Sequence, residues 1–283
     1  MTYLLLTSFI WAFSFGLIKI YLVGLDSGLV AAVRLGLALL VFLPFLRLKG
    51  LHLGSALKLI IIGFFQFGLM YVAYIQSFKY LQSFQVALFT IFTPLWVTLV
   101  NDLLEKRFHF RFLITAGLVV LGTGVIAFKG FGKEIVLTGF ILVQFSNLCF
   151  AAGQIGYARI MKGLPGRKDR EVFGLTYLGG FLAAGLSALL TLPGKSLTVT
   201  GPQIGILLYL GILASAVGFF LWNLGARKVN AGLLAVMNNL KVPLGVACSL
   251  VFFAEQTDLL RLLLGGLIIL VAFWMNEAWA KRG

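Results

Sequence analysis

Residues 71–89 read YVAYIQSFKYLQSFQVALF, and residues 219–237 read FFLWNLGARKVNAGLLAVM. At an offset of 148 the two stretches align aromatic with aromatic and basic with basic: Tyr71 with Phe219, Tyr74 with Trp222, Lys79 with Arg227. A proline follows each stretch, Pro94 in the first case and Pro243 in the second. Similarity at a fixed offset indicates that the chain contains an internal repeat.

Apolar runs occur along the whole chain. Hydrophobic residues make up 60% of the 283 residues and charged residues only 11%, against about 25% charged in soluble domains. About 20 apolar residues cross the hydrocarbon core as a helix. The sequence therefore predicts an all-α membrane protein with ten transmembrane helices, near residues 3–24, 27–46, 59–78, 83–101, 112–128, 136–158, 172–193, 203–225, 231–253 and 259–280.

Each repeat contains five of these spans, which is an odd number. Span 1 matches span 6 at an offset of 140, and Lys19 there aligns with Arg159. The short segment 129–135 divides the chain into residues 1–130 and residues 136–283. A five-helix unit leaves the membrane on the side opposite to its start, so the second unit must be inverted. We expect two inverted five-helix repeats, a common design of secondary transporters that work by alternating access.

The net charge of +14 follows the expected topology. An even number of spans places both termini on one side, together with most of the basic residues: Arg47, Lys49, Lys58, Lys106, Arg107, Arg111, Arg159, Lys162, Arg167, Lys168, Arg170, Arg227, Lys228, Lys281 and Arg282. The opposite side holds only Lys79, Lys129, Lys133, Lys195 and Arg261. Cytoplasmic loops carry such an excess. We expect an integral protein of the bacterial cytoplasmic (inner) membrane with both termini in the cytoplasm, and no nucleic-acid partner.

The repeated segments resemble a known family. The stretches KYLQSFQVALFTIFTPLWVTLVNDLLEKRF (79–108) and TAGLVVLGTGVIAF (115–128), and in the second half ARKVNAGLLAVMNNLKVPLGVACSLVFFAEQ (226–256) and LLGGLIILVAF (263–273), are similar to the EamA-type domain of the drug/metabolite transporter superfamily. The resemblance implies a ten-span permease with spans 1–4 and 6–9 around a central cavity and spans 5 and 10 at the periphery. Where the family often has an acidic residue beside the second proline, this chain reads Asn-Asn-Leu-Lys-Val-Pro.

Polar and aromatic residues at helical spacing mark candidate solute-binding positions. Polar side chains in membrane helices usually face the bundle interior. The candidates on spans 1, 6, 3 and 8 are Trp11, Ser14, Asn147, Gln154, Tyr71, Tyr74 and Trp222. Each could line a cavity or bond to a neighbouring helix.

Three cations lie inside predicted spans. Lys241, with Asn238 one turn before it, is near the centre of span 9, where a charge costs about 2.5–3.5 kcal/mol. It could contact a solute, be neutralised by desolvation, or cap carbonyls freed by Pro243. Arg34 could hold neighbouring helices or contact a solute. Lys19 lies toward one end of span 1 and can reach the membrane interface.

Every Asp and Glu falls near the end of a span. A cavity with cations and amides but no acids favours an anionic or zwitterionic solute. We therefore expect a secondary transporter of a small polar metabolite, such as an amino acid or organic acid; an exporter of amphipathic or aromatic compounds is the alternative. The sequence predicts neither an enzyme nor a scaffold, and no cofactor or metal. The expected partners are the solute and the lipid bilayer, and a homodimer is compatible with the sequence.

Overall fold

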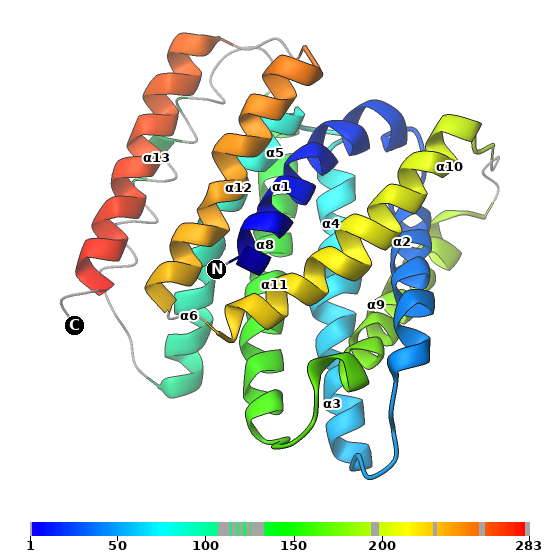
Figure 1. Ribbon diagram of the computed structural model, residues 1–283. Helices are drawn as coiled ribbons and strands as arrows, with labels where there is room; N and C mark the ends of the chain where they lie inside the picture. The colour runs from blue at the N-terminus through cyan, green and yellow to red at the C-terminus, as the bar shows by residue number, and fades with distance from the viewer. Residues whose placement is uncertain are drawn as a thin grey trace.

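The computed structural model describes residues 2–106, 133–193, 198–228, 231–254 and 258–280, with a few isolated positions between 114 and 125. Every regular element in these ranges is helical, as predicted (Figure 1). The α-helices are α1 (Thr2–Leu17), α2 (Ser27–Phe42), α3 (Leu53–Gly63), α4 (Met70–Ser77), α5 (Ser83–Phe89), α6 (Thr93–Glu105), α8 (Lys133–Lys162), α9 (Asp169–Thr191), α10 (Gly201–Leu208), α11 (Gly218–Ala226), α12 (Ala231–Phe252) and α13 (Leu259–Ala280). The π-helical segments η1 (Ile18–Leu22), η3 (Phe64–Leu69) and η5 (Tyr209–Val217) and the 3₁₀ turns η2 (Leu43–Phe45) and η4 (Thr90–Phe92) continue these helices.

Long apolar helices follow the predicted spans closely. Within the described residues, 7 helical stretches are long and apolar enough to cross a membrane: Thr2–Leu22, Ser27–Phe45, Leu53–Ser77, Ser83–Leu104, Val136–Lys162, Asp169–Thr191 and Gly201–Ala226. Helices α12 and α13, each of 22 residues, occupy the last two predicted spans. The predicted span 112–128 lies outside the continuous described ranges. In Figure 1, α13 lies at one edge of the bundle.

The third span begins earlier than the sequence pattern suggested. The helix begins at Leu53, whereas hydropathy placed the start near residue 59. His52 precedes it in an extended conformation, and its ring nitrogen accepts a hydrogen bond from the Gly54 N–H at 3.2 Å. The first N–H groups of a helix have no intrahelical partner, and this cap supplies an acceptor for one of them.

Glycines let α9 approach α3 and η3 at backbone distance. A Cβ atom on Gly63 would lie 1.8 Å from the Thr176 carbonyl oxygen, and one on Gly179 would lie 1.9 Å from that of Ile60. Small residues at helix contacts are typical of membrane bundles, where close packing drives association. These glycines fix the distance between the third and seventh spans.

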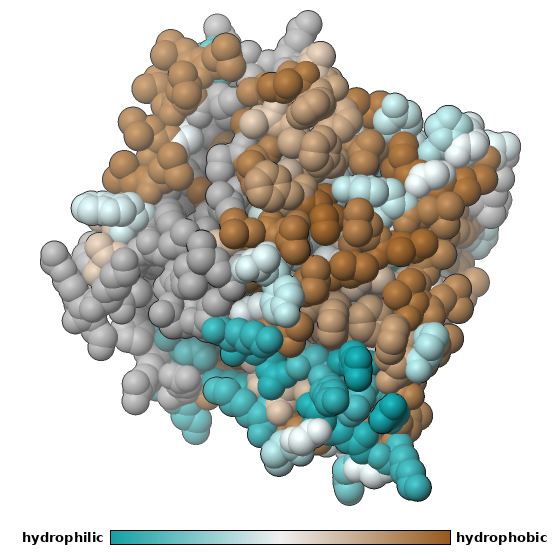
Figure 2. Space-filling view, viewed as in Figure 1, coloured by the Kyte–Doolittle hydropathy of each residue, from teal (hydrophilic) through white to brown (hydrophobic). Residues whose placement is uncertain are grey.

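Polar side chains gather at one end of the bundle. Figure 2 shows hydrophobic side chains over the upper part of the molecule and hydrophilic side chains at the lower end. We call this lower end, with the loops 46–52 and 163–168, the basic end; it carries Arg47, Lys49, Arg167, Lys168, Arg227 and Lys228. Exposed leucines such as Leu40 (62%) and Leu190 (74%) lie along the helices, where lipid would cover them.

Lys19 has a structural partner that the sequence did not indicate. Its ammonium group donates to the carbonyl oxygens of Phe78 at 2.7 Å and Leu81 at 2.9 Å. The last carbonyls of a helix lack intrahelical donors, and Lys19 supplies donors where the chain leaves α4. These bonds hold the turn against the first span and are compatible with the predicted place of Lys19 toward the end of that span.

Candidate solute-binding site

A cavity that is partly open to the outside lies within the bundle. Its lining comes from both halves of the chain: Trp11, Ser14 and Phe15 of α1, Arg34 of α2, Met70, Tyr71 and Tyr74 of α4, Thr90 and Thr93 around η4, Ser146, Asn147 and Phe150 of α8, and Phe219 of α11. Small-molecule sites are usually lined by apolar and aromatic side chains with a few polar groups that fix the ligand. This lining has that composition.

Arg34 is the charged residue of the lining. It is 2% exposed, and its Nε donates to the Ser215 hydroxyl at 3.3 Å. Its Nη2 donates to the Tyr71 hydroxyl at 2.6 Å, and its Cζ lies 4.0 Å from the centroid of the Tyr71 ring. The guanidinium is therefore held in one orientation by the third span and the eighth.

The remaining terminal nitrogen of Arg34, Nη1, is unpaired among the described residues. Within the described part of the chain, Nη1 has no hydrogen-bond partner and no carboxylate forms an ion pair with this guanidinium. A buried charge without a counter-ion is costly, and a planar guanidinium matches a carboxylate or phosphate through paired hydrogen bonds. Arg34 thus combines a place in the cavity lining with a buried donor that lacks a partner among the described residues.

Ser215 is positioned by the π-helical segment η5. Its hydroxyl donates to the Leu210 carbonyl five residues earlier at 2.6 Å and lies 2.9 Å from the Tyr71 hydroxyl. Tyr177 of α9 donates to the carbonyl oxygens of Ser215 and Ala216, each at 2.9 Å. π-Helical turns often occur at functional sites, and here the turn sets the hydroxyl that orients Arg34.

A second polar region of the lining is uncharged. Thr93 donates to the Asn147 side-chain oxygen at 3.2 Å, and the Asn147 amide nitrogen donates to the Phe89 carbonyl at 3.0 Å. The Thr90 hydroxyl donates to the Ala87 carbonyl at 2.7 Å. Hydroxyls have further acceptor capacity, so this region can bind a neutral polar group of a solute.

Aromatic rings form the apolar walls. The Trp11 ring lies 4.8 Å from Phe219 and 6.3 Å from Phe150, measured between centroids. The Trp11 indole N–H donates to the Ala214 carbonyl at 2.9 Å, which fixes the ring. On the other side, the Tyr74 ring lies 6.1 Å from that of Phe15. Such walls suit an apolar ring system between two polar ends.

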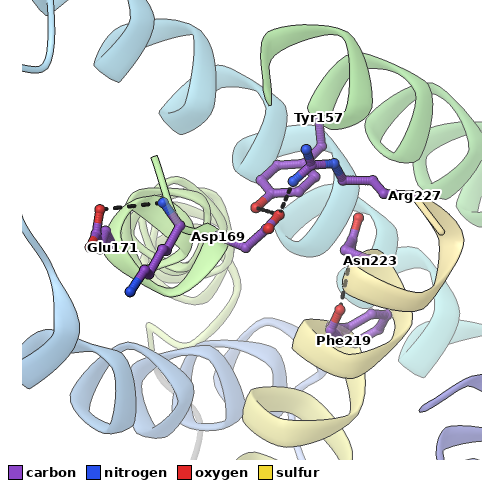
Figure 3. A network of polar contacts seen from close by, with 7 residues as sticks. Tyr157, Asp169, Glu171, Phe219, Asn223 and Arg227 are labelled. Atoms are coloured by element: carbon purple, nitrogen blue, oxygen red, sulfur yellow. Dashed lines mark hydrogen bonds and ion pairs between the residues drawn. The ribbon is translucent and has the colours of Figure 1, made fainter. Parts of the chain in front are cut away.

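An ion pair lies at the basic end. Asp169, the first residue of α9, accepts hydrogen bonds from the Tyr157 hydroxyl at 2.8 Å and from the Arg227 guanidinium (Figure 3). These side chains come from α8, α9 and the end of α11. The contact ties three helices together at the basic end.

The structure separates the sequence-predicted residues into three groups. The cavity lining includes Trp11, Ser14, Arg34, Tyr71, Tyr74 and Asn147. Gln154 and Trp222 lie outside this lining and bond to each other, with the indole N–H 3.2 Å from the amide oxygen. Asn238 and Lys241 lie on α12, but their side chains are outside the described part of the structure.

Several lining residues had no clear sequence signal. Thr90 and Thr93 lie in the turn before Pro94, and that proline is the one local cue to an interrupted helix. Phe150 and Phe219 are 2 of 27 phenylalanines. Ser146 adjoins the predicted Asn147. A serine or threonine in a membrane helix often bonds to its own backbone, so its type does not mark a site.

A family model and two sequence relatives all point to a transporter. The model of the EamA-like transporter family matches residues 1–128 and again residues 137–276. The biotin transporter of Escherichia coli (strain K12) is 38% identical over 281 residues, covering 99% of this chain and 93% of the relative. The probable biotin transporter of Pseudomonas aeruginosa is 42% identical over 279 residues, covering 98% of this chain and 97% of the relative.

A solved crystal structure shares the fold. It has 18% sequence identity and a TM-score of 0.65, and the match covers 99% of this chain and 96% of the other. At this identity the likeness concerns the fold alone.

The family model, the relatives and the long apolar helices all indicate a membrane transporter. The predicted resemblance is confirmed, as is the prediction of a transporter over a membrane-embedded enzyme. The protein is an integral membrane protein. The chain belongs to the EamA-like transporter family.

Proposed function

We propose that the protein transports biotin or a closely similar carboxylate solute, with the solute carboxylate bound by Arg34. The observation that carries this proposal is the buried Nη1 of Arg34, which has no hydrogen-bond partner among the described residues, on a guanidinium that is 2% exposed. A carboxylic acid is ionised at neutral pH, so a bound carboxylate would neutralise the buried charge. The names of the relatives from Escherichia coli and Pseudomonas aeruginosa supply the identity of the solute.

The chemistry of biotin matches the lining in three respects. Its carboxylate suits Arg34, and its apolar sulfur ring suits the rings of Trp11 and Phe219. Its ureido group has both N–H donors and a carbonyl acceptor. The region of Thr93 and Asn147 offers hydroxyl and amide groups for such a partner.

Lys241 remains a proposed second cation for the solute. Gly245, one turn later on α12, lies against Phe15 of the cavity lining, since a Cβ there would be 3.0 Å from that ring. Residues four apart share a helix face. This supports a place for Lys241, and for Asn238 one turn before it, on the side of α12 that faces the first span.

For the architecture we propose ten spans in two inverted repeats, residues 1–130 and 136–283. The family model matches twice, at nearly these positions. The π-helical segment Phe64–Leu69 corresponds, at the offset of 148, to residues 212–217, which lie inside η5 (Tyr209–Val217). Recurrence of an uncommon π-turn at equivalent positions supports a common origin of the halves.

The transport mechanism we propose is alternating access in the inner membrane, with the basic end and both termini in the cytoplasm. Trp11, Phe150 and Phe219 line the cavity, and the Asp169–Arg227 pair lies beyond them at the basic end. A solute would cross when these contacts open and the opposite side closes. The excess of basic residues supports the orientation.

Export of amphipathic or aromatic compounds is the second candidate. The aromatic walls around Trp11 favour it. The open guanidinium favours the carboxylate solute, because an aromatic site for neutral compounds would not need to bury an unpaired charge. Substitution of Arg34 distinguishes the two.

Counterflow of labelled biotin in proteoliposomes tests the function. We expect the protein to exchange internal unlabelled biotin for external label, and Arg34→Gln to raise the KM for biotin by about 10–150-fold, the loss of a charge-assisted hydrogen bond of about 1.5–3 kcal/mol. Biotin methyl ester, which lacks the charge, should compete equally well with both proteins. Absence of counterflow, or an unchanged KM in Arg34→Gln, contradicts the proposal.

A further inference from the structure

A group of buried amides lies next to the cavity but outside its lining. Gln66 of η3, Gln154 of α8 and Asn223 of α11 are 0%, 6% and 2% exposed. The Gln66 amide nitrogen donates to the Asn223 oxygen at 3.3 Å, and the Trp222 indole N–H donates to the Gln154 oxygen at 3.2 Å. Because Trp222 and Asn223 are consecutive, both glutamines meet α11 at the same level.

Gln66 of η3 also packs against α8 at the residue before Gln154. A Cβ atom on Gly153 would lie 2.2 Å from the Cβ of Gln66, so Gln66 packs against the residue just before Gln154. The absence of a side chain at Gly153 makes room for this approach. Gln66 and Gln154 therefore belong to one group, which we call the amide pair.

Each member of the amide pair has one unsatisfied atom. Among the described residues, Gln66 Oε1 accepts no hydrogen bond and Gln154 Nε2 donates none. Buried polar atoms are nearly always paired in proteins, and exceptions commonly mark bound water or ligand. An acceptor on one glutamine and a donor on the other are complementary to a group that carries both an N–H and a C=O.

The amide pair lies on the basic side of the aromatic wall. Trp11 and Phe150 line the cavity, and Trp222 packs behind them, with ring centroids 5.1 Å and 6.4 Å away. Tyr157, which bonds to Asp169 at the basic end, follows Gln154 by three residues on α8. A solute that leaves the cavity toward the basic end would meet the amide pair before the ion pair.

We infer that Gln66 and Gln154 form a second solute subsite, which binds the ureido group of the solute once the aromatic wall opens. This inference rests on the proposed function. A ureido N–H would donate to Gln66 Oε1, and the ureido carbonyl would accept from Gln154 Nε2. The solute first binds in the cavity. The subsite then provides hydrogen-bond partners for the ureido group while the solute crosses.

The test combines binding and transport in one double variant, Gln66→Met with Gln154→Met. The double variant also removes the donor to the buried Asn223 oxygen and the acceptor of the Trp222 indole N–H, and each loss lowers the stability of the fold. We expect an unchanged Kd for biotin, a lower unfolding temperature than that of the parent, and turnover in proteoliposomes that is lower by about tenfold. If the double variant is poorly folded, the single variant Gln154→Met replaces it, because it leaves the Gln66–Asn223 bond in place. It should likewise keep the Kd for biotin and lower the turnover.

Lipoate provides the chemical control, because it has a carboxylate chain and a sulfur ring but no ureido group. The ratio of biotin to lipoate turnover should be about tenfold or more in the parent and fall toward one in the double variant. Gln76→Met is the matched control variant: Gln76 lies on α4 outside both sites and accepts from Ser27 at 2.6 Å. It should leave the ratio unchanged.

The outcomes separate the two proposals. If the parent neither binds nor moves biotin, the proposed function itself fails. If the parent transports biotin and the double variant transports it equally fast, the amide pair holds only water and the inference is overturned. Parallel loss of biotin and lipoate turnover shows a packing role and also overturns it.

Discussion

Tyr71 holds Arg34 in two ways at once: its hydroxyl accepts a hydrogen bond from Nη2 at 2.6 Å, and its ring lies 4.0 Å from the guanidinium carbon. The two residues are on different spans, α4 and α2. A guanidinium fixed by ring and hydroxyl loses little freedom when it binds an anion, and this lowers the entropic cost of binding. In the proposed site, Tyr71 would therefore act on the solute through Arg34.

The Tyr71→Phe variant tests this positioning role. The ring remains and the hydroxyl is lost, so we expect the KM for biotin to rise about tenfold, with maximal velocity nearly unchanged. Arg34→Lys keeps the charge but loses the planar guanidinium. Its KM for biotin should therefore lie between that of the parent and that of Arg34→Gln. Uptake kinetics in proteoliposomes measure both. A Tyr71→Phe protein with the parent KM would show that the hydroxyl serves the fold alone.

Asp169→Asn removes the charge that joins Arg227 and Tyr157 at the basic end. Loss of a charge-assisted bond of about 1.5–3 kcal/mol should shift the protein toward a form open at that end by about 10–150-fold. Maleimide labelling of Asn223→Cys in a background lacking the native cysteines reports the opening.

Arg47→Gln is the control for that measurement. Arg47 lies 4.0 Å from Glu171, and its side chain is 73% exposed. Exposed ion pairs contribute only about 0–1 kcal/mol, so its labelling rate should stay near that of the parent. Equal rates in Asp169→Asn and Arg47→Gln would contradict a closing role for Asp169.

Gly179→Ala tests the close contact between α3 and α9. The added Cβ would lie 1.9 Å from the Ile60 carbonyl oxygen, so we expect destabilisation by about 1–3 kcal/mol or more. Gly185 is on the same helix, and a Cβ added there would meet nothing within 4 Å, so Gly185→Ala is the matched control. Thermal unfolding in detergent compares them. Equal unfolding temperatures would show that the helices separate at little cost.

Lys19→Met removes the donor to the carbonyls of Phe78 and Leu81. Two buried acceptors would lose a charged partner, which should lower stability by about 1.5–3 kcal/mol. The KM for biotin should not change, because Lys19 is outside the cavity lining. A variant with normal stability and impaired uptake would instead assign Lys19 to the transport path.

Lys241→Gln tests the second cation. If Lys241 contacts the carboxylate or sets the charge of the cavity, uptake of biotin falls at least about tenfold. Uptake of biotin methyl ester, if any, should not fall. Unchanged transport of every anionic solute would remove Lys241 from the proposed site and leave Arg34 as its cation.

The helices could be predicted from the sequence because hydropathy is a local property. The stretch from Ser27 to Phe45 needs no distant partner to be recognised as a span. The repeat was equally visible, since Tyr71 and Phe219 align by counting alone. Helical spacing also selected Trp11 and Ser14, which do line the cavity.

The partners of these residues were not visible in the same way. Arg34 and Ser215 are 181 positions apart, and Gln66 and Asn223 are 157 apart. Span 6 presented Asn147 and Gln154 as one polar face, yet only Asn147 lines the cavity. Two helical turns along α8 separate them, and the rings of Trp11, Phe150 and Trp222 lie at the level between.

The amino-acid sequence by itself determined the membrane class, the apolar helices and the family, because apolar length and repeated motifs are carried by consecutive residues. Only the tertiary structure decided which buried cation and which amides lack hydrogen-bond partners among the described residues. The physical reason is that burial and hydrogen bonding depend on which helices meet. In this bundle the contacts that matter join helices from opposite halves of the chain.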